Sequence, residues 1–325
     1  MRRVSLRVFD ALILLWLVTT LTFALIHLAP GDPATLLIAP TATAEEAAAL
    51  RATLGLDAAW PEQYVRWVGG VLQGDLGSSY VRSMPVRAVI AEALPVSLFL
   101  GGVSLLMSFV AGTGLGVYQA LRAGRRTDAT LTVLSTALFA APGFWLALAL
   151  VTVFTSGVVW LGLPDWMRLP AFGMQSPAAD PSVSGWGDRW RHAVLPLLVL
   201  GIPGAAGVAR YARQSVREAS HAPHVASAAA RGLSRTRIEL RHVLRTALTP
   251  LVVLFGLTLP GVIAGSVFVE QVFAWPGLGR TMLSAIASRD YPVVLGLTLV
   301  YAAAVVTANL LADLALWALD PRRRR

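Results

Sequence analysis

Two histidines come closest to a metal-binding pattern in this sequence. His221 and His224 are three residues apart, a spacing that suggests a metal site. Zinc sites in proteins use three or four ligands, however, and no carboxylate or third histidine stands at a matching spacing from this pair. The pattern therefore favours a surface or contact role for both histidines over a metal site.

Ionisable side chains within apolar stretches form the second group of candidates. Asp313 lies in the last apolar stretch, one helical turn after Asn309, and a carboxylate at such a depth is a functional candidate by default. The arginines at 322–325 make pairing or helix packing an equally good explanation. Glu270 lies at the end of the preceding apolar stretch, where we favour a structural salt bridge. The Trp-Pro-Gly sequence at 275–277 indicates a turn with an interfacial tryptophan, with a gate or a re-entrant turn as alternatives.

The sequence lacks the residues of the common catalytic sites. All 27 lysine-or-arginine positions are arginines, which excludes a P-loop lysine, a Schiff-base lysine and a lysine general base. Cysteine is absent too, so the chain can form no disulfide, thiolate nucleophile or cysteine metal site. We find no Ser/His/Asp set and no pair of carboxylates on one helix face. We therefore predict that the chain is not an enzyme, that it binds no cofactor, and that any ATP hydrolysis belongs to another chain.

The composition places these side chains in a membrane protein. Hydrophobic residues make up 56% of the 325 and charged residues only 14%, and the mean hydropathy of +0.64 is too high for an ordinary soluble domain. Six apolar stretches are candidates to cross a bilayer: residues 9–28, 94–118, 131–161, 193–209, 248–273 and 291–319. We expect an all-α fold with six transmembrane helices. The first stretch is expected to be an uncleaved anchor, because the residues after it make a poor signal-peptide cleavage site.

Helix-breaking residues interrupt several of the predicted spans. They are Pro142-Gly143 in the third span, Pro196 and Pro203-Gly204 in the fourth, and Pro260-Gly261 in the fifth. They indicate either bends around a pathway or the kinks that membrane helices ordinarily tolerate, and the sequence leaves both open. Gly112 and Gly116, in the second span, form a small-xxx-small face that predicts helix packing.

The polar stretch at 29–93 predicts a separate helical segment after the first span. Thr43 with Glu46 forms a capping box for a short helix that ends near Gly55. Pro61 starts a second helix whose apolar and aromatic side chains recur at helical spacing, and we expect this stripe to pack on the membrane-spanning part. The predicted organisation is an anchor at 1–28, this segment at 29–93, and a membrane core at 94–325 that contains a polar loop at 210–247.

That long polar interval, residues 210–250, separates the fourth and fifth spans. Pro223 favours the first position of a helix and Gly232 favours its end, so we predict a helix at 223–231. At a rise of about 1.5 Å per residue this helix is a rod of about 14 Å. Its middle holds only alanine and serine, and it presents a thin surface that a groove in another protein can grip. A second helix is predicted to start at Ser234 and to run into the fifth span.

Charge predicts the orientation of the chain. The interval at 210–250 carries eight arginines against two glutamates, whereas residues 29–92 carry four arginines against seven acids. Arginine and lysine collect in the cytoplasmic loops of membrane proteins, so we expect the interval and both termini in the cytoplasm. Membrane orientation thus explains the formal charge of +9, and nucleic-acid binding is disfavoured.

Several short motifs occur in order along the chain. They are Ala29-Pro30-Gly31-Asp32-Pro33-Ala34, Gly74-Asp75-Leu76-Gly77-Ser78, the polar loop, the sequence EQVFAWPGLGR at 270–280, the sequence SRDYPVV at 288–294, and Asn309 through Asp313 to Asp320-Pro321-Arg322. From residue 29 to the C-terminus they resemble the inner-membrane permeases of dipeptide, oligopeptide and nickel ABC importers. The loop resembles the family signature E-A-A-x3-G, with Ala226, Ser227 and Ala228 at its first three positions and no leading glutamate. Pro223-His224 also stands where relatives commonly have an acidic residue and a tyrosine.

The resemblance implies a permease subunit in the bacterial inner membrane that pairs with a second, homologous permease in a heterodimer. It also implies two cytoplasmic ATPase subunits that use ATP and Mg²⁺, and an external substrate-binding protein. The helix in the polar loop then corresponds to the coupling helix, with the ATPase contact formed by Pro223, His224, Val225, Ala226, Ser227, Ala228, Ala229, Ala230, Arg231, Gly232 and Leu233. The candidates for an external gate or turn are Glu270, Trp275, Pro276, Gly277, Gly279 and Arg280.

On this interpretation the chain forms half of an import pathway, with di- or oligopeptides as the expected substrate. Nickel chelates or other small solutes are alternatives for the same machinery. An ion-coupled secondary transporter is a different class, and it predicts acidic or histidine relays near mid-bilayer, where the spans offer only the off-centre Asp313. A membrane scaffold without transport would leave the thin-surfaced cytoplasmic helix unexplained.

Overall fold

The structure is a computed structural model that describes residues 2–29, 33, 34, 38, 43–176, 185–264 and 266–319. The regular elements among these residues are helices, and an isolated bridge pairs Ser78 with Pro85. Six helical segments in this part of the chain are long and apolar enough to cross a bilayer: Phe9–Leu28, Val86–Leu121, Gly143–Trp160, Trp186–Ser220, Arg235–Thr258 and Tyr291–Ala312. The prediction of an all-α fold with six spans is confirmed.

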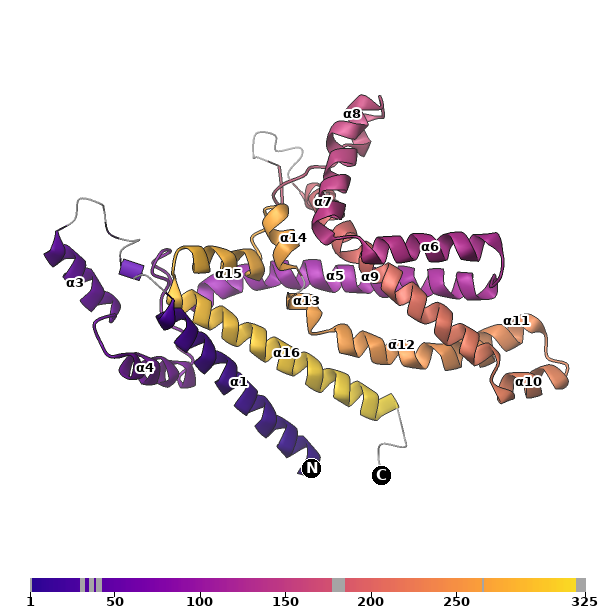
Figure 1. The fold of residues 1–325 in the computed structure, drawn as a ribbon, viewed down its shortest axis with the longest axis horizontal. Helices are drawn as coiled ribbons and strands as arrows, with labels where there is room; N and C mark the ends of the chain where they lie inside the picture. Colours follow the sequence, from indigo (N-terminus) through magenta and orange to yellow (C-terminus); the bar gives the residue numbers. More distant parts are fainter. Residues whose placement is uncertain are drawn as a thin grey trace. The chain divides into compact units, whose positions relative to one another are not determined.

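The chain forms two compact units, Met1–Ser97 with Pro276–Thr307, and Leu98–Trp275 with Ala308–Arg325 (Figure 1). The first unit contains α1 (Arg2–Leu28), α3 (Ala44–Leu54), α4 (Trp60–Leu72), the start of α5 (Val86–Leu121), α15 (Leu278–Ala287) and most of α16 (Tyr291–Leu319). The second contains the rest of α5, α6 (Arg126–Ala140), α7 (Gly143–Thr152), the π-helical η1 (Val153–Gly157), α8 (Val158–Trp160), η2 (Asp165–Met167), α9 (Trp186–Ser220) and α10 (Pro223–Ala230). It continues with α11 (Arg235–Ile238), the π-helical η3 (Glu239–Val243), α12 (Leu244–Thr258), α13 (Gly261–Ala264) and α14 (Val267–Val272).

In the first unit, α3 and α4 form where the sequence predicts them. The capping box is present, because the Glu46 N–H donates to Thr43 Oγ1 at 3.3 Å and the Thr43 N–H donates to Glu46 Oε2 at 2.8 Å. Gly55 ends α3 with a φ of 68°, a left-handed conformation that glycine adopts without steric cost. α4 packs on α1, where the hydroxyl oxygens of Thr20 and Tyr64 are 2.6 Å apart. The aromatic stripe of α4 thus contacts the first span, as expected.

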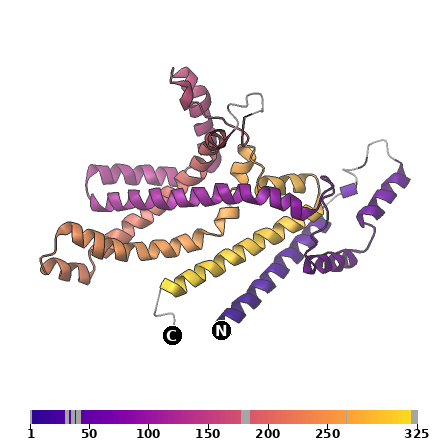
Figure 2. The same ribbon diagram turned by 180° about the vertical axis from the view of Figure 1, so that it is seen from behind.

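In the second unit, α6, α7 and α12 pack on α9, and α5 lies against it as well (Figures 1 and 2). Two glycines of α5 make this last contact possible. A Cβ atom at Gly112 would lie 2.5 Å from the carbonyl oxygen of Ala205, and one at Gly116 would lie 2.4 Å from that of Ala209. The two helices therefore touch through their backbones, and the predicted packing face is confirmed.

The proline residues of the spans act in two different ways. Pro142-Gly143 separates α6 from α7, and Pro260 precedes the start of α13, whereas Pro196 and Pro203 lie inside the continuous α9. A proline removes one helical hydrogen bond, and neighbouring helices can compensate for the loss where the helix is buried. The buried share of the span is 56% in α9 and 17% in the span at α7. Pro250 also lies inside a helix, α12, although the span that contains it is only 22% buried, so burial alone does not decide the outcome.

These breaks correct two of the predicted spans. The sequence suggested single helices at 131–161 and 248–273, but the third spanning segment begins only at Gly143 and the fifth runs from Arg235 to Thr258. The fifth span starts earlier because α11, η3 and α12 follow one another without a gap, as expected for a helix that starts near Ser234. The fourth span is longer than predicted and begins at Trp186.

Candidate functional site

The helix predicted at 223–231 is present as α10, one residue shorter than expected. Pro223 occupies its first turn and Arg231 closes it. Gly232 follows with a φ of 76°, and its N–H donates to the carbonyl of Ala229 at 2.9 Å. Proline at the start and glycine after the end are therefore the local features that set its length.

The inner face of α10 is small, apolar and fixed to its neighbours. Val225 and Ala228 are its buried side chains. Val225 belongs to a core cluster that also contains Val216 and Ala219 of α9, Val243 of η3 and Ala247 of α12. The Oγ–H of Ser215 in α9 also donates to the carbonyl of Ala247 at 2.8 Å. Burial of each of the three valines stabilises the cluster by about 1.5–3 kcal/mol, so α10, α9 and α12 are held together at this end.

The outer face of α10 carries almost no side-chain bulk. Ala226, Ser227, Ala229 and Ala230 are all exposed. The Ser227 hydroxyl donates to the carbonyl of Pro223 at 3.0 Å, so it lies along the helix instead of projecting from it. The result is a shallow ridge whose backbone comes close to the surface, a shape that suits the groove of a partner protein.

The two histidines near α10 make contacts to helix backbone. Nδ1 of His221 lies 2.7 Å from the carbonyl oxygen of Arg217. Nε2 of His224 lies 3.4 Å from both the carbonyl oxygen of His242 and the hydroxyl of Thr246. Within the described ranges, no group of three or more His, Cys, Asp or Glu side chains is placed to hold a metal ion. His224 thus contributes to the attachment of α10 to η3 and α12.

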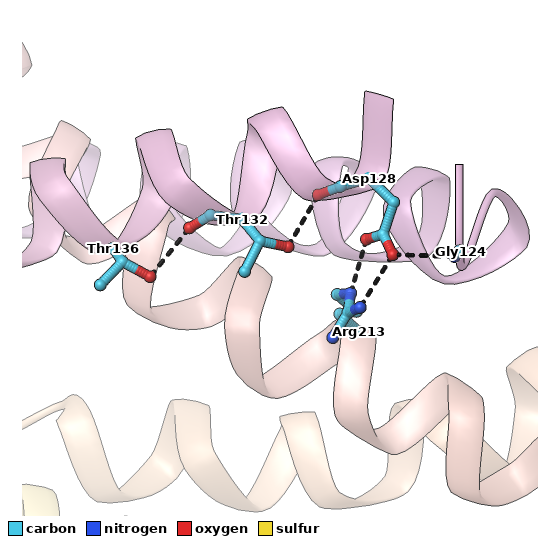
Figure 3. Close-up of polar contacts among 5 residues, drawn as sticks. All are labelled: Gly124, Asp128, Thr132, Thr136 and Arg213. Atoms are coloured by element: carbon cyan, nitrogen blue, oxygen red, sulfur yellow. Dashed lines mark hydrogen bonds and ion pairs between the residues drawn. The ribbon is translucent and has the colours of Figure 1, made fainter. Parts of the chain in front are cut away.

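An ion pair joins α6 to α9 near α10 (Figure 3). Asp128 is only 4% exposed, and Arg213 donates to both of its carboxylate oxygens, from Nε to Oδ1 at 2.7 Å and from Nη2 to Oδ2 at 2.8 Å. The N–H of Gly124, in the turn between α5 and α6, donates to Oδ2 at 3.2 Å. The hydrogen bonds from Arg213 hold the pKa of Asp128 below its ordinary value, although burial opposes that shift. In the sequence both residues contribute only to the net charge, and the pair was not predicted.

A second buried carboxylate, Asp290, organises the first unit. It accepts the N–H of Tyr80 at 3.0 Å, the N–H of Val81 at 3.4 Å and the hydroxyl of Ser79. Burial, together with the adjacent charge of Asp290, raises the pKa of Tyr80 to about 12. The loop before α5 is thereby fastened to the turn between α15 and α16. Asp290 lies in the SRDYPVV motif, so a signal was present in the sequence, but its partners were not predictable from it.

The candidates for an external gate occupy different environments. Glu270, in α14, is fully buried and accepts a hydrogen bond from the Ser266 hydroxyl at 2.5 Å. Trp275 is 2% exposed and stacks on Phe99, with 6.1 Å between the ring centroids. It is therefore a core residue of the second unit, where the sequence suggested an interfacial tryptophan. The predicted turn is present and leads through Pro276 and Gly277 into α15, whose first turn contains Gly279 and Arg280.

The intramembrane polar candidates lie on α16. Asn309 is exposed in this chain. The backbone of Asp313 is helical, but its side chain lies outside the described part of the structure. The motif at 29–34 lies partly outside the described residues, and the end of the chain from residue 320 lies wholly outside them.

A cavity of about 410 Å³ lies in the second unit between α5, α9 and the segment from α12 to Ser266. Its polar lining consists of hydroxyl groups, and none of the described residues that line it is charged. Ser108, for example, donates to the carbonyls of Ser104 and Gly201 at 2.8 and 3.1 Å. The serine and threonine hydroxyls of α5 and α12 donate to helix carbonyls and that of Ser266 donates to the carboxylate of Glu270, which leaves a weakly polar surface for a solute.

Comparison with known proteins agrees with this architecture. Residues 112–325 match the family model of the binding-protein-dependent transport system inner membrane component, and residues 1–101 match the model of the N-terminal part of such a membrane component. The oligopeptide transport system permease AppB of Bacillus subtilis is 34% identical over 94% of this chain and 93% of its own length. The glutathione transport system permease GsiC of Salmonella paratyphi A is 34% identical over 95% of this chain and 94% of its own length.

The fold has a counterpart among solved structures. The crystal structure of an amino acid ABC transporter with histidines is similar to this chain, with a TM-score of 0.50 and 12% sequence identity. The match covers 70% of this chain and 92% of the chain in that structure. At that identity the likeness concerns the fold alone. The family matches confirm the resemblance that the motifs suggested, and the six apolar helices agree with a multi-pass inner-membrane protein. The chain therefore belongs to the family of inner-membrane components of binding-protein-dependent transport systems, the permease subunits of these transporters.

Proposed function

We propose that this chain is one of the two permease subunits of an ABC importer that carries small peptides. The observation that carries the proposal is α10, a short helix whose inner face is fixed to α9 and α12 and whose outer face is thin. A helix transmits a push as a rigid body, because its backbone hydrogen bonds are internal. Two ATPase subunits supply that push in the proposed complex, since this sequence has no lysine with which to form its own P-loop.

The proposed topology places both termini and α10 in the cytoplasm and residues 29–93 outside. The arginine-rich interval around α10 and the acidic balance of the 29–92 stretch support this orientation. Residues 29–93 then face the substrate-binding protein, and residues 94–325 form the permease core. A second, homologous permease completes the pathway, and Mg²⁺ and ATP are bound by the ATPase subunits.

Peptides are the proposed substrate class, because two relatives are named for oligopeptide and glutathione transport. The uncharged cavity with its hydroxyl lining supports a pathway that binds solute weakly, while the binding protein selects the solute. Nickel chelates and other small solutes remain outcomes of the test.

Copurification and reconstitution test the proposal together. The chain is produced together with candidate ATPase, permease and binding-protein subunits and extracted in mild detergent. It is then assayed in vesicles for ATP-dependent uptake of labelled di- and tripeptides. Ala229→Trp adds bulk to the exposed face of α10 and should lose the ATPase, whereas Thr130→Trp, at an exposed position of α6, should retain it. The proposal fails if the folded wild-type chain recovers neither partner, or if uptake follows an ion gradient without ATP. Uptake of nickel chelates in place of peptides would replace the substrate class alone.

A further inference from the structure

We propose that the Asp128–Arg213 ion pair is the contact through which movement of α10 reaches α6. The inference rests on the proposed coupling role of α10 and names the two positioning residues that act behind it. Arg213 precedes the end of α9 at Ser220 by seven residues, which is about two helical turns. The pair therefore lies close to the part of α9 that is fixed to α10.

The first step of the argument is that α9 follows α10. Val225 of α10 shares its core cluster with Val216 and Ala219, which lie one and two turns beyond Arg213 on α9. α9 is continuous through this region, so a displacement of its last turns also displaces Arg213.

The second step concerns how α9 holds α6. Farther along the two helices, the ring of Phe139 in α6 lies against α9. A Cβ atom at Gly207 would be 3.1 Å from this ring, and the guanidinium of Arg210 lies 5.3 Å from the ring centroid. Such contacts resist separation, but they impose little direction and allow the helices to slide. A bidentate pair between a planar guanidinium and a carboxylate fixes distance and angle together. Asp128–Arg213 is thus the directional contact between α6 and α9.

The third step is the attachment of Asp128 to its own surroundings. Asp128 lies in the first turn of α6, where the helix dipole favours a negative charge, and it also accepts the Gly124 N–H from the preceding turn. Thr132 donates to the carbonyl of Asp128 at 2.8 Å and Thr136 donates to that of Thr132 at 2.8 Å, along the same side of α6 (Figure 3). A pull on the carboxylate consequently acts on the first turns of α6 and on the turn that joins it to α5.

Burial makes the pair testable, because loss of one partner differs from loss of both. Asp128 is buried, so a single substitution leaves an uncompensated charge, which destabilises the protein strongly. The double variant Asp128→Asn with Arg213→Gln keeps two hydrogen-bonding side chains of similar shape and leaves no buried charge. A purely structural role predicts that the double variant recovers full activity, whereas a transmitting role predicts that it recovers folding but not coupling.

The experiment compares ATP hydrolysis and peptide uptake in the same vesicles, with the complete transporter. We expect D128N, R213Q and the double variant to lower uptake per ATP by about tenfold, while hydrolysis stimulated by the binding protein remains close to wild type. Glu218→Gln is the matched control, because Glu218 is an exposed acid of α9 that accepts a hydrogen bond from Gln214 of the same helix. It should leave uptake per ATP unchanged. If the single variants do not fold, the double variant carries the test.

A second readout follows the helices directly. The chain has no cysteine, so Thr130→Cys on α6 and Tyr211→Cys on α9, both exposed positions, give two unique sites for spin labels. With the ion pair intact, the distance between the labels should be the same with and without ATP; in the double variant it should change or broaden when ATP binds. The inference is overturned if the double variant regains wild-type uptake per ATP, or if uptake and hydrolysis fall in equal proportion. It is also overturned if the distance between the labels responds to ATP in the same way in the double variant as with the ion pair intact. A wild-type transporter without ATP-driven uptake would instead overturn the proposed function.

Discussion

Replacing Gly116 with alanine should force α5 away from α9 beside the ion pair. The added Cβ would lie 2.4 Å from the carbonyl oxygen of Ala209, 2.6 Å from the Cβ of Ala212 and 2.9 Å from the amide nitrogen of Arg213. Real Cβ atoms keep at least about 3.0 Å from such neighbours, so the two backbones must separate by the difference, about 0.6 Å. Overpacking of this kind costs about 1–3 kcal/mol, and the better helix propensity of alanine offsets about 1 kcal/mol of it. We expect a net loss of up to about 2 kcal/mol.

A neighbouring glycine on the same helix provides the control for this prediction. Gly114 has no atom within 4 Å of the position that a Cβ would occupy, so Gly114→Ala gains propensity without a clash. Thermal unfolding of the detergent-solubilised chain measures both variants under identical conditions. Gly116→Ala should unfold several degrees below wild type, and Gly114→Ala at or above it. Equal unfolding temperatures for the two alanine variants would refute the inference that backbone contact between α5 and α9 limits stability here.

Three further predictions concern α10, the ion pair and the loop before α5. Gly232→Val places a β-branched residue at a φ of 76°, where there is open space but the backbone conformation costs about 1–3 kcal/mol of strain. We expect this strain to loosen the end of α10 and to separate uptake from ATP hydrolysis, while membrane insertion is unaffected. Normal uptake would count against the coupling role. Because the folded-state pKa of Asp128 is lowered, its contribution to stability is present above the ordinary carboxyl pKa and is lost as the pH falls through the folded pKa. Acidification below about pH 4 should therefore lower the unfolding temperature of wild type more than that of D128N, and parallel profiles would contradict this. Asp290→Asn removes the charged acceptor of two hydrogen bonds, from the Tyr80 N–H and the Ser79 hydroxyl, each of which contributes about 1.5–3 kcal/mol. The loop before α5 should loosen, so proteolysis between α4 and α5 should be faster. Unchanged cleavage would argue against the anchoring role of Asp290.

Features that depend on near neighbours in the chain were predictable. Pro223 and Gly232 located α10 to within one residue, and Thr43 with Glu46 located the start of α3. Hydropathy located six spans, although it misjudged the bounds of the third, fourth and fifth. The errors in the third and fifth spans arise because a proline ends one helix and is tolerated in another, and the contacts with neighbouring helices that decide between the two are not contained in the local sequence.

The polar contacts that organise the two units were beyond the sequence. Asp128 and Arg213 are 85 positions apart, and Tyr80 and Asp290 are 210 apart. Asp128 and Arg213 were visible only as charges and Asp290 only as part of a motif, whereas nothing in the sequence singled out Tyr80. Trp275 was expected at a membrane interface although it stacks within a core. The choice of partner depends on how each helix is rotated and which face it presents to its neighbour.

The sequence by itself thus determined a helical membrane protein of six spans, the short helix between the fourth and fifth spans, and the resemblance to its family. The spans and the short helix follow from composition and from backbone preferences that a few adjacent residues set, and the resemblance follows from short motifs that occur in order. Only the tertiary structure decided that α10 is fixed to α9 through Val225 and that α9 holds α6 through Asp128 and Arg213. Such partnerships arise when packing brings distant side chains together and removes them from solvent, where a charged group must find its counterpart.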